Sequence, residues 1–213
     1  GLPELNEAFA AELSADYGAS IPPSHLLPTG GCNQAFCVIT ATLTQPGDEV
    51  IVPVPYYFNH DMWLKLDGVR PVYLHPAGEP GPGNAGVLVP DPERAAALIT
   101  ARTRAIVLVT PANPTGAVTP PEVIHAFHRL AVEHDIALIV DETYRNFRGT
   151  RDAPHQLFSQ PGWENNVISL HSFSKDLAIP GYRVGAIVAG PDVIYEALKL
   201  VDCVQISAPR IGQ

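Results

Sequence analysis

The sequence has few charged residues, and most of them are negative. Only 16% of its 213 residues are charged, and 13 Lys and Arg against 22 Asp and Glu leave a net charge of -9 at pH 7. A nucleic-acid partner requires a basic surface that neutralises phosphates, so this composition argues against one. The sequence also lacks any apolar run approaching the roughly 20 residues of a membrane span, and its first residues lack a signal-peptide pattern. We therefore expect neither nucleic acid nor a membrane as a partner.

Cysteine is scarce as well. The three cysteines, Cys32, Cys37 and Cys203, are an odd number in an unpaired spacing, which suits reduced thiols in the cytoplasm better than a disulfide framework. His125 and His128 have helical spacing, but no carboxylate or thiol completes a metal-ligand set around them. We expect a cytoplasmic protein with no metal site, in which these two histidines lie on a solvated helix face.

Apolar runs that alternate with helical patterns make up most of the chain, and 46% of the residues are hydrophobic, enough for one sizeable core. Runs rich in Val, Ile and Leu predict seven strands covered on both faces, at 25–29, 49–54, 71–75, 104–110, 136–141, 167–172 and 183–189. Helices are predicted near 3–17, 33–45, 57–67, 91–100 and 191–203, and a Gly- and Pro-rich loop at 76–84. The alternation predicts the α/β class, with a mostly parallel sheet joined by crossover helices.

The clearest helix signal begins at Thr119. Thr-Pro-Pro-Glu predicts an N-cap at Thr119, proline in the first turn and a capping-box glutamate at Glu122. One face of this helix is apolar and is predicted to pack on the sheet: Val123, Phe127, Leu130 and Ala131.

The most informative stretch is Ser172-Phe173-Ser174-Lys175, which ends a predicted strand and lies eight residues before Arg183. A lysine amine can form a Schiff base with an aldehyde. Ser172 and Arg183 can bind a phosphate through charge-assisted hydrogen bonds. Pyridoxal phosphate carries both groups. Because serine also precedes many surface lysines, this motif alone does not establish such a site.

Three further motifs each follow a predicted strand. They are Thr29-Gly30-Gly31-Cys32-Asn33-Gln34-Ala35, Pro111-Ala112-Asn113-Pro114-Thr115-Gly116 and Asp141-Glu142-Thr143-Tyr144. In this order and spacing, the four motifs resemble the class I/II aminotransferases of the aspartate-aminotransferase fold, which are fold-type-I pyridoxal-phosphate enzymes. The resemblance runs from Gly1 to Gln213 and implies a three-layer large domain.

The resemblance assigns catalytic roles to three residues. Lys175 would bind the cofactor aldehyde and move a proton between the substrate's alpha carbon and the cofactor's C4′. Asp141 ends an apolar strand, where a carboxylate is costly unless it is paired, and the pyridinium nitrogen is the expected partner. Tyr144, together with Asn113, should hydrogen-bond the cofactor's phenolic oxygen. The alternatives are a surface lysine, an aspartate that caps a turn or pairs with an arginine, and a plain turn at Asn113.

The phosphate of the cofactor is expected at the start of the helix that follows Gly31. Gly31, Cys32 and Asn33 would bind it through free backbone N–H groups, in addition to Ser172 and Arg183. If Arg183 reaches the same phosphate as Ser172, it lies at the carboxyl edge of the sheet. Because Arg183 begins the predicted strand 183–189, that last strand is expected to run antiparallel to its neighbours.

Tyr57 matches the aromatic residue that stacks on the cofactor ring in relatives, with its neighbour Tyr56 as the alternative. Glu142, although next to Asp141, should point away from the site. His171 precedes Ser172 and could either touch the site or pack at the strand end.

The resemblance implies an aminotransferase that moves an amino group between an amino acid and a 2-keto acid through a Lys175 Schiff base. The stretch 174–185 is also similar to 1-aminocyclopropane-1-carboxylate synthases, and carbon–sulfur lyases share the fold, so lyase or synthase chemistry is an alternative. A non-catalytic aminotransferase-like domain is a third possibility.

Residues 1–213 are expected to form the pyridoxal-phosphate-binding large domain. The family's N-terminal arm and C-terminal small domain, which holds the arginine for the substrate carboxylate, would lie outside it. The full-length protein is expected to be a homodimer. The amino-acid substrate is not predicted by this sequence.

Overall fold

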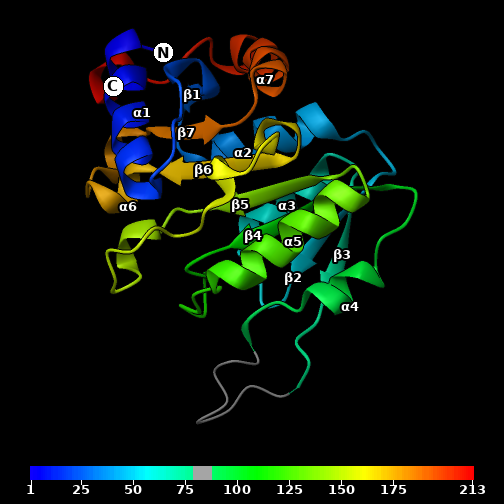
Figure 1. Ribbon diagram of the computed structural model, residues 1–213. Coiled ribbons are helices and arrows are strands. Elements are labelled where there is room, and N and C mark those ends of the chain that lie inside the picture. The colour runs from blue at the N-terminus through cyan, green and yellow to red at the C-terminus, as the bar shows by residue number, and fades with distance from the viewer. Residues whose placement is uncertain (79–87) are drawn as a thin grey trace.

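A seven-stranded sheet lies between two layers of helices in the computed structural model, which describes residues 1–78 and 88–213 (Figure 1). The strand order is β1-β7-β6-β5-β4-β2-β3. This arrangement confirms the predicted α/β class with a mostly parallel sheet covered on both faces. The predicted loop at 76–84 lies largely outside the described residues.

All seven predicted strands are present. Their bounds are β1 Leu26–Thr29, β2 Glu49–Pro53, β3 Arg70–Leu74, β4 Thr103–Val109, β5 Ala137–Asp141, β6 Val167–Ser172 and β7 Gly185–Val188. The central strands β4, β5 and β6 are almost wholly buried, which their continuous Val, Ile and Leu content predicts.

The last strand, β7, runs antiparallel to both of its neighbours, β1 and β6, as predicted. Gly185 is paired with Thr29 on one side and Ser172 on the other. Arg183 does not begin this strand as expected. It lies two residues before it, in the left-handed region with φ 55°, because the short 3-10 helix Pro180–Tyr182 ends there and the chain must turn into β7.

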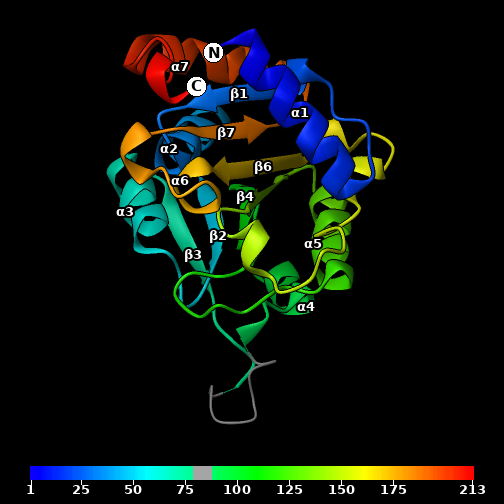
Figure 2. The same ribbon diagram turned by 90° about the vertical axis from the view of Figure 1, so that its left-hand side faces the viewer.

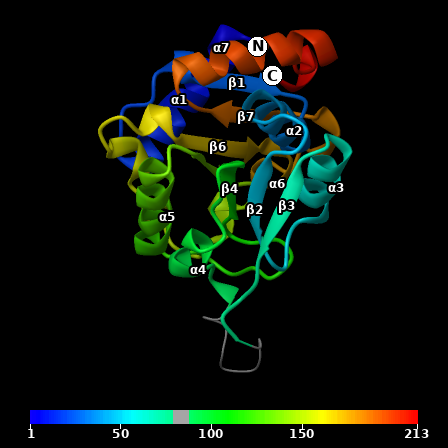
Figure 3. The ribbon, with the colours of Figure 1, turned by 90° about the vertical axis from the view of Figure 1, so that its right-hand side faces the viewer.

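Successive side chains of each strand point to opposite faces of the sheet, and a separate apolar core covers each face. Helices α1 (Pro3–Tyr17), α4 (Pro92–Ala96) and α5 (Pro121–Glu133) cover one face. Helices α2 (Cys32–Leu43), α3 (Phe58–Leu66) and α7 (Pro191–Val204) cover the other. Figures 2 and 3 show the two layers from opposite sides. The short α6 (Phe173–Asp176) follows β6 directly.

Helix α5 confirms the predicted packing but corrects two details. Phe127, Leu130 and Ala131 are buried, yet the capping box is absent: the N-cap is Pro120, and no side chain caps the helix. Thr119 instead lies buried in the preceding loop, where its N–H donates to Thr110 Oγ1 at 3.0 Å. His128 is also buried rather than solvated, because it follows Phe127 on the sheet-facing side. Burial lowers its pKa.

The parallel strands bring their carboxyl ends to one edge of the sheet. Val109, Asp141 and Ser172 are the last residues of β4, β5 and β6, which are consecutive neighbours. In open α/β sheets this edge is where ligands bind. Within the described residues, no helix combines the length and the apolar character needed to cross a membrane.

Candidate active site

A cavity of about 340 Å³ opens at this carboxyl edge. It is lined by Cys32, Asn33, Tyr57, Val109, Asn113, Asp141, Thr143, Tyr144, Ser172, Ser174, Lys175, Pro180 and Arg183. Nine of the ten residues selected from the sequence are in this set, and the tenth, Gly31, precedes Cys32. The lining residues come from strand ends, loops and the helices α2 and α6, and they are spread over about 150 residues of chain. Figure 2 shows these elements close together at one edge of the sheet, where the parallel topology brings them.

Asp141 is the buried carboxylate of the cavity, with 3% of its surface exposed. Its Oδ2 lies 3.2 Å from His60 Nε2, and its Oδ1 accepts a hydrogen bond from the Thr143 N–H at 3.0 Å. Burial raises the pKa of Asp141, but the contacts from His60 and Thr143 outweigh it and hold the pKa below its usual value. Asp141 is therefore an anion at neutral pH while facing a cavity.

His60, which was not predicted as a site residue, contacts Asp141. It is buried in the first turn of α3, and its ring stacks on Phe36 with centroids 3.9 Å apart. It lies one helical turn after Tyr57, so the two aromatic side chains fall on the same side of α3, with centroids 5.3 Å apart. The three-residue spacing between Tyr57 and His60 is the sequence feature that indicates a shared side of the helix. His60 contacts Oδ2 of Asp141 while the Thr143 N–H contacts Oδ1, so both carboxylate oxygens have a partner.

Lys175 lies at the rim of the cavity, exposed, in the short helix α6. Its Nζ is 6.0 Å from the centre of the Tyr144 ring. Asn113 lines the same cavity from the loop after β4. That loop is held by backbone hydrogen bonds between Ala112 and Ala117 at 2.8 Å and between Gly116 and Ala112 at 2.7 Å. The amine, the phenol and the amide therefore face one space.

The other end of the cavity is suited to an anion. Helix α2 begins at Cys32 with no side-chain cap, so its first N–H groups, which include those of Cys32 and Asn33, are free for a ligand. Arg183 lies across this end, donating to Pro180 O at 3.0 Å and to Gly30 O at 3.3 Å. The hydroxyl groups of Ser172 and Ser174 line the same cavity.

Two glycines allow this close packing. Gly31 has φ +96°, a conformation that strongly favours glycine, and a Cβ there would collide with the Arg183 guanidinium. Gly185 lies against the start of α2, and a Cβ there would come within 2.7 Å of Cys32 N, Gly31 C and His171 O. The start of α2 thus lies directly against β7.

Tyr57 lines the cavity, whereas Tyr56 does not. Tyr56 stacks on Tyr73, with centroids 5.5 Å apart, and belongs to the apolar core. Burial raises the pKa of Tyr57. The phenol of Tyr57 also lies 3.4 Å from Asn33 Oδ1.

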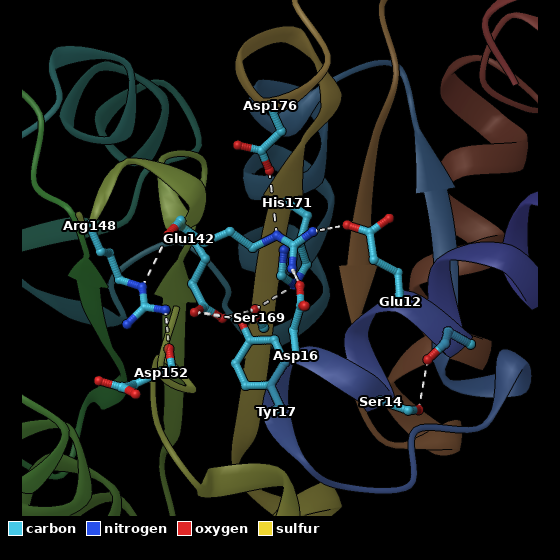
Figure 4. Close-up of polar contacts among 12 residues, drawn as sticks. Glu12, Ser14, Asp16, Tyr17, Glu142, Arg148, Asp152, Ser169, His171 and Asp176 are labelled. Carbon is cyan, nitrogen blue, oxygen red and sulfur yellow. Dashed lines mark hydrogen bonds and ion pairs between the residues drawn. The ribbon is translucent and has the colours of Figure 1, made fainter. Parts of the chain in front are cut away.

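Glu142 and His171 point to the opposite face of the sheet. Glu142 accepts hydrogen bonds from Tyr17 Oη at 2.6 Å and Ser169 Oγ at 2.5 Å, and His171 Nε2 lies 2.9 Å from Ser169 Oγ (Figure 4). Burial raises the pKa of Glu142, but its contacts with His155 and its other neighbours bring it down to about 2. Burial lowers the pKa of His171 to about 4. His171 is therefore a packed strand-end histidine outside the cavity.

The whole chain, residues 1–213, matches the family model described as aminotransferase class I and II. The protein belongs to this family. Its chain is 35% identical over 211 residues to the aspartate/prephenate aminotransferase of Thermus thermophilus, covering 98% of this chain and 52% of that protein. It is 32% identical over 200 residues to the aspartate aminotransferase of Pyrococcus horikoshii, covering 94% of this chain and 49% of that one.

Solved structures agree with this assignment. The structure of Thermus thermophilus aspartate aminotransferase with maleate superposes with a TM-score of 0.89 at 33% identity, over 100% of this chain and 53% of that one. An aromatic aminotransferase from Pyrococcus horikoshii gives a TM-score of 0.88 at 27% identity, over 100% of this chain and 56% of that one. The chain spans about half the length of the curated relatives it matches.

Class I and II aminotransferases depend on pyridoxal phosphate, and the donor set of the cavity fits this cofactor. The end formed by Arg183 and the start of α2 offers a cation and free N–H groups, which is what a phosphate requires. The cavity also holds the buried anion Asp141, whose Oδ1 lies 3.7 Å from Cys32 Sγ and which is a partner for a protonated ring nitrogen. Lys175 at the rim supplies the amine. A zwitterionic molecule with an aldehyde matches this set of groups.

Proposed function

We propose that this chain is the cofactor-binding part of a pyridoxal-phosphate-dependent aminotransferase, which moves an amino group between an amino acid and a 2-keto acid. One observation carries the proposal: a single cavity holds an amine, a buried carboxylate and an anion-binding helix start. Each of these groups would meet a different part of one cofactor.

The bound cofactor supplies an electron sink for the negative charge that develops on the substrate's alpha carbon. Asp141 holds the proton on the ring nitrogen because its own pKa is depressed. Lys175 Nζ takes the proton from the substrate's alpha carbon and returns it to the acceptor carbon. Tyr144 Oη and Asn113 Nδ2 would donate toward the ring oxygen, and Tyr57 would pack on the ring face. Gly31, Cys32, Asn33, Ser172 and Arg183 would hold the phosphate.

Residues 1–213 would then be the large domain of a longer protein. The relatives are about twice as long as this chain, since it covers 52% and 49% of two of them. The substrate carboxylate would be bound by residues outside this chain.

We further propose a cytoplasmic homodimer. Phe58, Met62 and Leu66 recur every four residues on α3 and are 59%, 52% and 79% exposed, so they form an apolar stripe on one face of that helix. A second copy of the protein would cover such a stripe. The three cysteines are free thiols, which fits a reducing compartment. Sedimentation of the protein tests the dimer, and a monomer at working concentration would contradict it.

A single-turnover experiment tests the reaction. The cofactor-loaded protein is mixed with an amino acid in the absence of a keto acid, and the products are quantified. Transamination predicts one keto acid for each pyridoxamine phosphate formed. Ammonia with pyruvate, or a released thiol, would instead indicate the lyase chemistry of the same fold, and binding without any product would indicate a non-catalytic domain. Lys175→Ala should abolish the products, whereas Lys199→Ala, at an exposed position on α7, should not.

A further inference from the structure

Four of the proposed site residues have a direct chain neighbour in a polar group on the α1 side of the sheet, which is buried except for the side chains of Glu12 and Asp16. Glu142 follows Asp141, Arg145 follows Tyr144, His171 precedes Ser172, and Asp176 follows Lys175. We call this group the α1 network, because helix α1 completes it (Figure 4). Its members are Glu12, Asp16, Tyr17, Glu142, Arg145, Ser169, His171 and Asp176.

Arg145 is the only cation among these eight residues that is charged at every relevant pH, and its side chain is only 3% exposed. It forms ion pairs with Glu12 and Asp16 of α1, and its Nε lies 3.4 Å from Asp176 Oδ2. The carboxylates of Glu12, Asp16 and Asp176 are arranged around one point beside His171 (Figure 4). Three carboxylates from two distant segments therefore converge on one guanidinium.

The segments that Arg145 joins carry two of the proposed catalytic residues. Tyr144 immediately precedes the 3-10 helix Arg145–Phe147, and Lys175 lies in the four-residue helix α6. Helices this short have little stability of their own, so tertiary contacts must set their positions. The contact between Arg145 and Asp176 ties the two segments together behind the cavity, while Lys175 Nζ lies 6.0 Å from the Tyr144 ring on the cavity side.

Fold stability alone is a poor reason to bury this charge. Arg145 and Asp176 are 3% and 8% exposed, and the desolvation of such a buried ion pair offsets most of its attraction. The carboxylates of Glu12 and Asp16 are 51% and 43% exposed, so solvent screening leaves their ion pairs with Arg145 little net stability as well. Burial also raises the pKa of Asp176 to about 6, against the opposing effect of Arg145. The ion pairs of Arg145 instead hold the 3-10 helix Arg145–Phe147 at a fixed distance from α6.

We propose that Arg145 is a positioning residue: by pairing with Asp176 and with the α1 carboxylates, it fixes the separation of Tyr144 and Lys175. This inference rests on the proposed function, because only that function makes Tyr144 and Lys175 catalytic residues. Glu12 and Asp16 anchor the guanidinium from α1, so this helix supports the site without touching the cavity.

The test compares Arg145→Gln, Arg145→Lys and Asp176→Asn with wild type in the full-length, cofactor-loaded protein. A displacement of about 1 Å in a catalytic group can cost about 100-fold in rate, so we expect kcat to fall by about 10- to 100-fold in Arg145→Gln and Asp176→Asn, with KM unchanged. The kcat of Arg145→Lys should lie between those of these variants and that of wild type, because lysine keeps the positive charge but lacks the planar guanidinium that can contact several carboxylates.

A second readout does not depend on turnover. The pH midpoint of the bound cofactor's absorption change reports the surroundings of Lys175 and Tyr144, and it should shift in Arg145→Gln and Asp176→Asn. The double variant should shift it no further than either single variant, because both remove the same contact. Arg151→Gln is the matched control. This arginine is exposed in the same loop region and makes no ion pair within the described residues.

A folded Arg145→Gln variant with wild-type kcat and an unchanged absorption midpoint would overturn the proposal, even if its melting temperature fell. If Arg145→Gln does not fold, Asp176→Asn and Arg145→Lys decide by the same two readouts. The two proposals fail differently. If the wild-type protein neither binds the cofactor through a lysine nor forms keto acid, the proposed function is contradicted. If the wild type is active and the variants have the same kcat and absorption midpoint as wild type, only the role of Arg145 is contradicted.

Discussion

At the scale of single residues, Asp141 combines two properties that usually conflict, deep burial and a negative charge. The cost of desolvating a carboxylate is several kcal/mol, and here the contacts from His60 and the Thr143 N–H offset it. These two contacts leave the carboxylate facing the cavity. A residue stabilised in this way can hold a cationic ligand without giving up its own charge.

Replacing Asp141 with Asn keeps the shape of the side chain and removes the charge. We expect activity to fall by at least about 100-fold, the usual loss when one electrostatic contact to the reacting group is removed. Thermal stability should change little, because the amide oxygen can still accept from Thr143. The comparison is with Asp202→Asn, at an exposed position on α7. A marked loss of stability, with full activity in the folded fraction, would assign Asp141 a purely structural role.

Which residues could be predicted depended on how local their signal was. Asp141, Ser172 and Asn113 stand at or just after the ends of apolar strands, and the parallel topology then brings them together, so strand assignment was enough to group them. His60 was missed because its role depends on Asp141, 81 positions away, and nothing local to His60 indicates that contact. His128 was assigned to solvent because periodicity alone does not define how wide the buried face of a helix is.

At the scale of elements, strand alternation explains how one segment serves both faces. Asp141 and Ser172 face the cavity, while their neighbours Glu142 and His171 face α1. The antiparallel strand β7 then places Gly185 between Thr29 and Ser172. As a result, the start of α2 rests directly on the sheet, with its free N–H groups beside Arg183.

Gly185→Ala tests this close packing. The added Cβ would approach the backbone atoms Cys32 N, Gly31 C and His171 O at 2.7 Å, and backbone yields less readily than a flexible side chain. We expect a loss of about 1–3 kcal/mol in the free energy of unfolding and weaker binding of pyridoxal phosphate, measured by equilibrium titration. Gly181→Ala is the control, since a Cβ there meets nothing within 4 Å. Equal effects in both variants would refute this account of α2.

The seven strands and the long helices were predictable, because each carries a periodic apolar pattern that burial on the sheet imposes. The short elements were not. The helix α6 and the 3-10 helix Pro180–Tyr182 have four and three residues, which is too few to show a periodic pattern of apolar residues in the sequence. Arg183 was therefore placed at the start of β7, although it lies before it. The capping box at Thr119 failed because the helix begins two residues later, at Pro121.

At the scale of the whole molecule, two buried groups of the α1 network link protonation to stability in opposite directions. Burial lowers the pKa of His171 from 6.5 to about 4, so its contribution to stability is full above pH 6.5 and is lost as the pH falls through 4. Burial raises the pKa of Asp176 from 3.8 to about 6, so its contribution is full below pH 3.8 and is lost as the pH rises through 6. Between these limits the two effects oppose each other.

Replacing either of these two groups alone should therefore change how steeply the free energy of unfolding varies with pH. In Asp176→Asn, the free energy of unfolding should fall more steeply than in wild type as the pH drops from 6.5 to 4. In His171→Gln it should fall less steeply, or rise. Urea unfolding at several pH values in this window measures both slopes, with Asp202→Asn as the control. Three parallel curves would contradict the assignment of these two groups.

We propose that Lys175 is the residue that bonds to pyridoxal phosphate, and the composition makes this easy to test. The chain contains only three lysines, Lys65, Lys175 and Lys199. Lys65 pairs with Asp61 at 2.9 Å on α3, and Lys199 pairs with Glu196 at 2.7 Å on α7. Neither lines the cavity.

The most direct measurement is to load the full-length protein with pyridoxal phosphate, reduce it with borohydride, digest it and locate the added mass by mass spectrometry. We expect the cofactor on the peptide that contains Lys175, in a ratio approaching one per chain, and no addition at Lys65 or Lys199. Lys175→Arg should carry no added mass at any of the three positions. Addition at Lys65 or Lys199 in place of Lys175, or at a lysine outside this chain, would contradict the account.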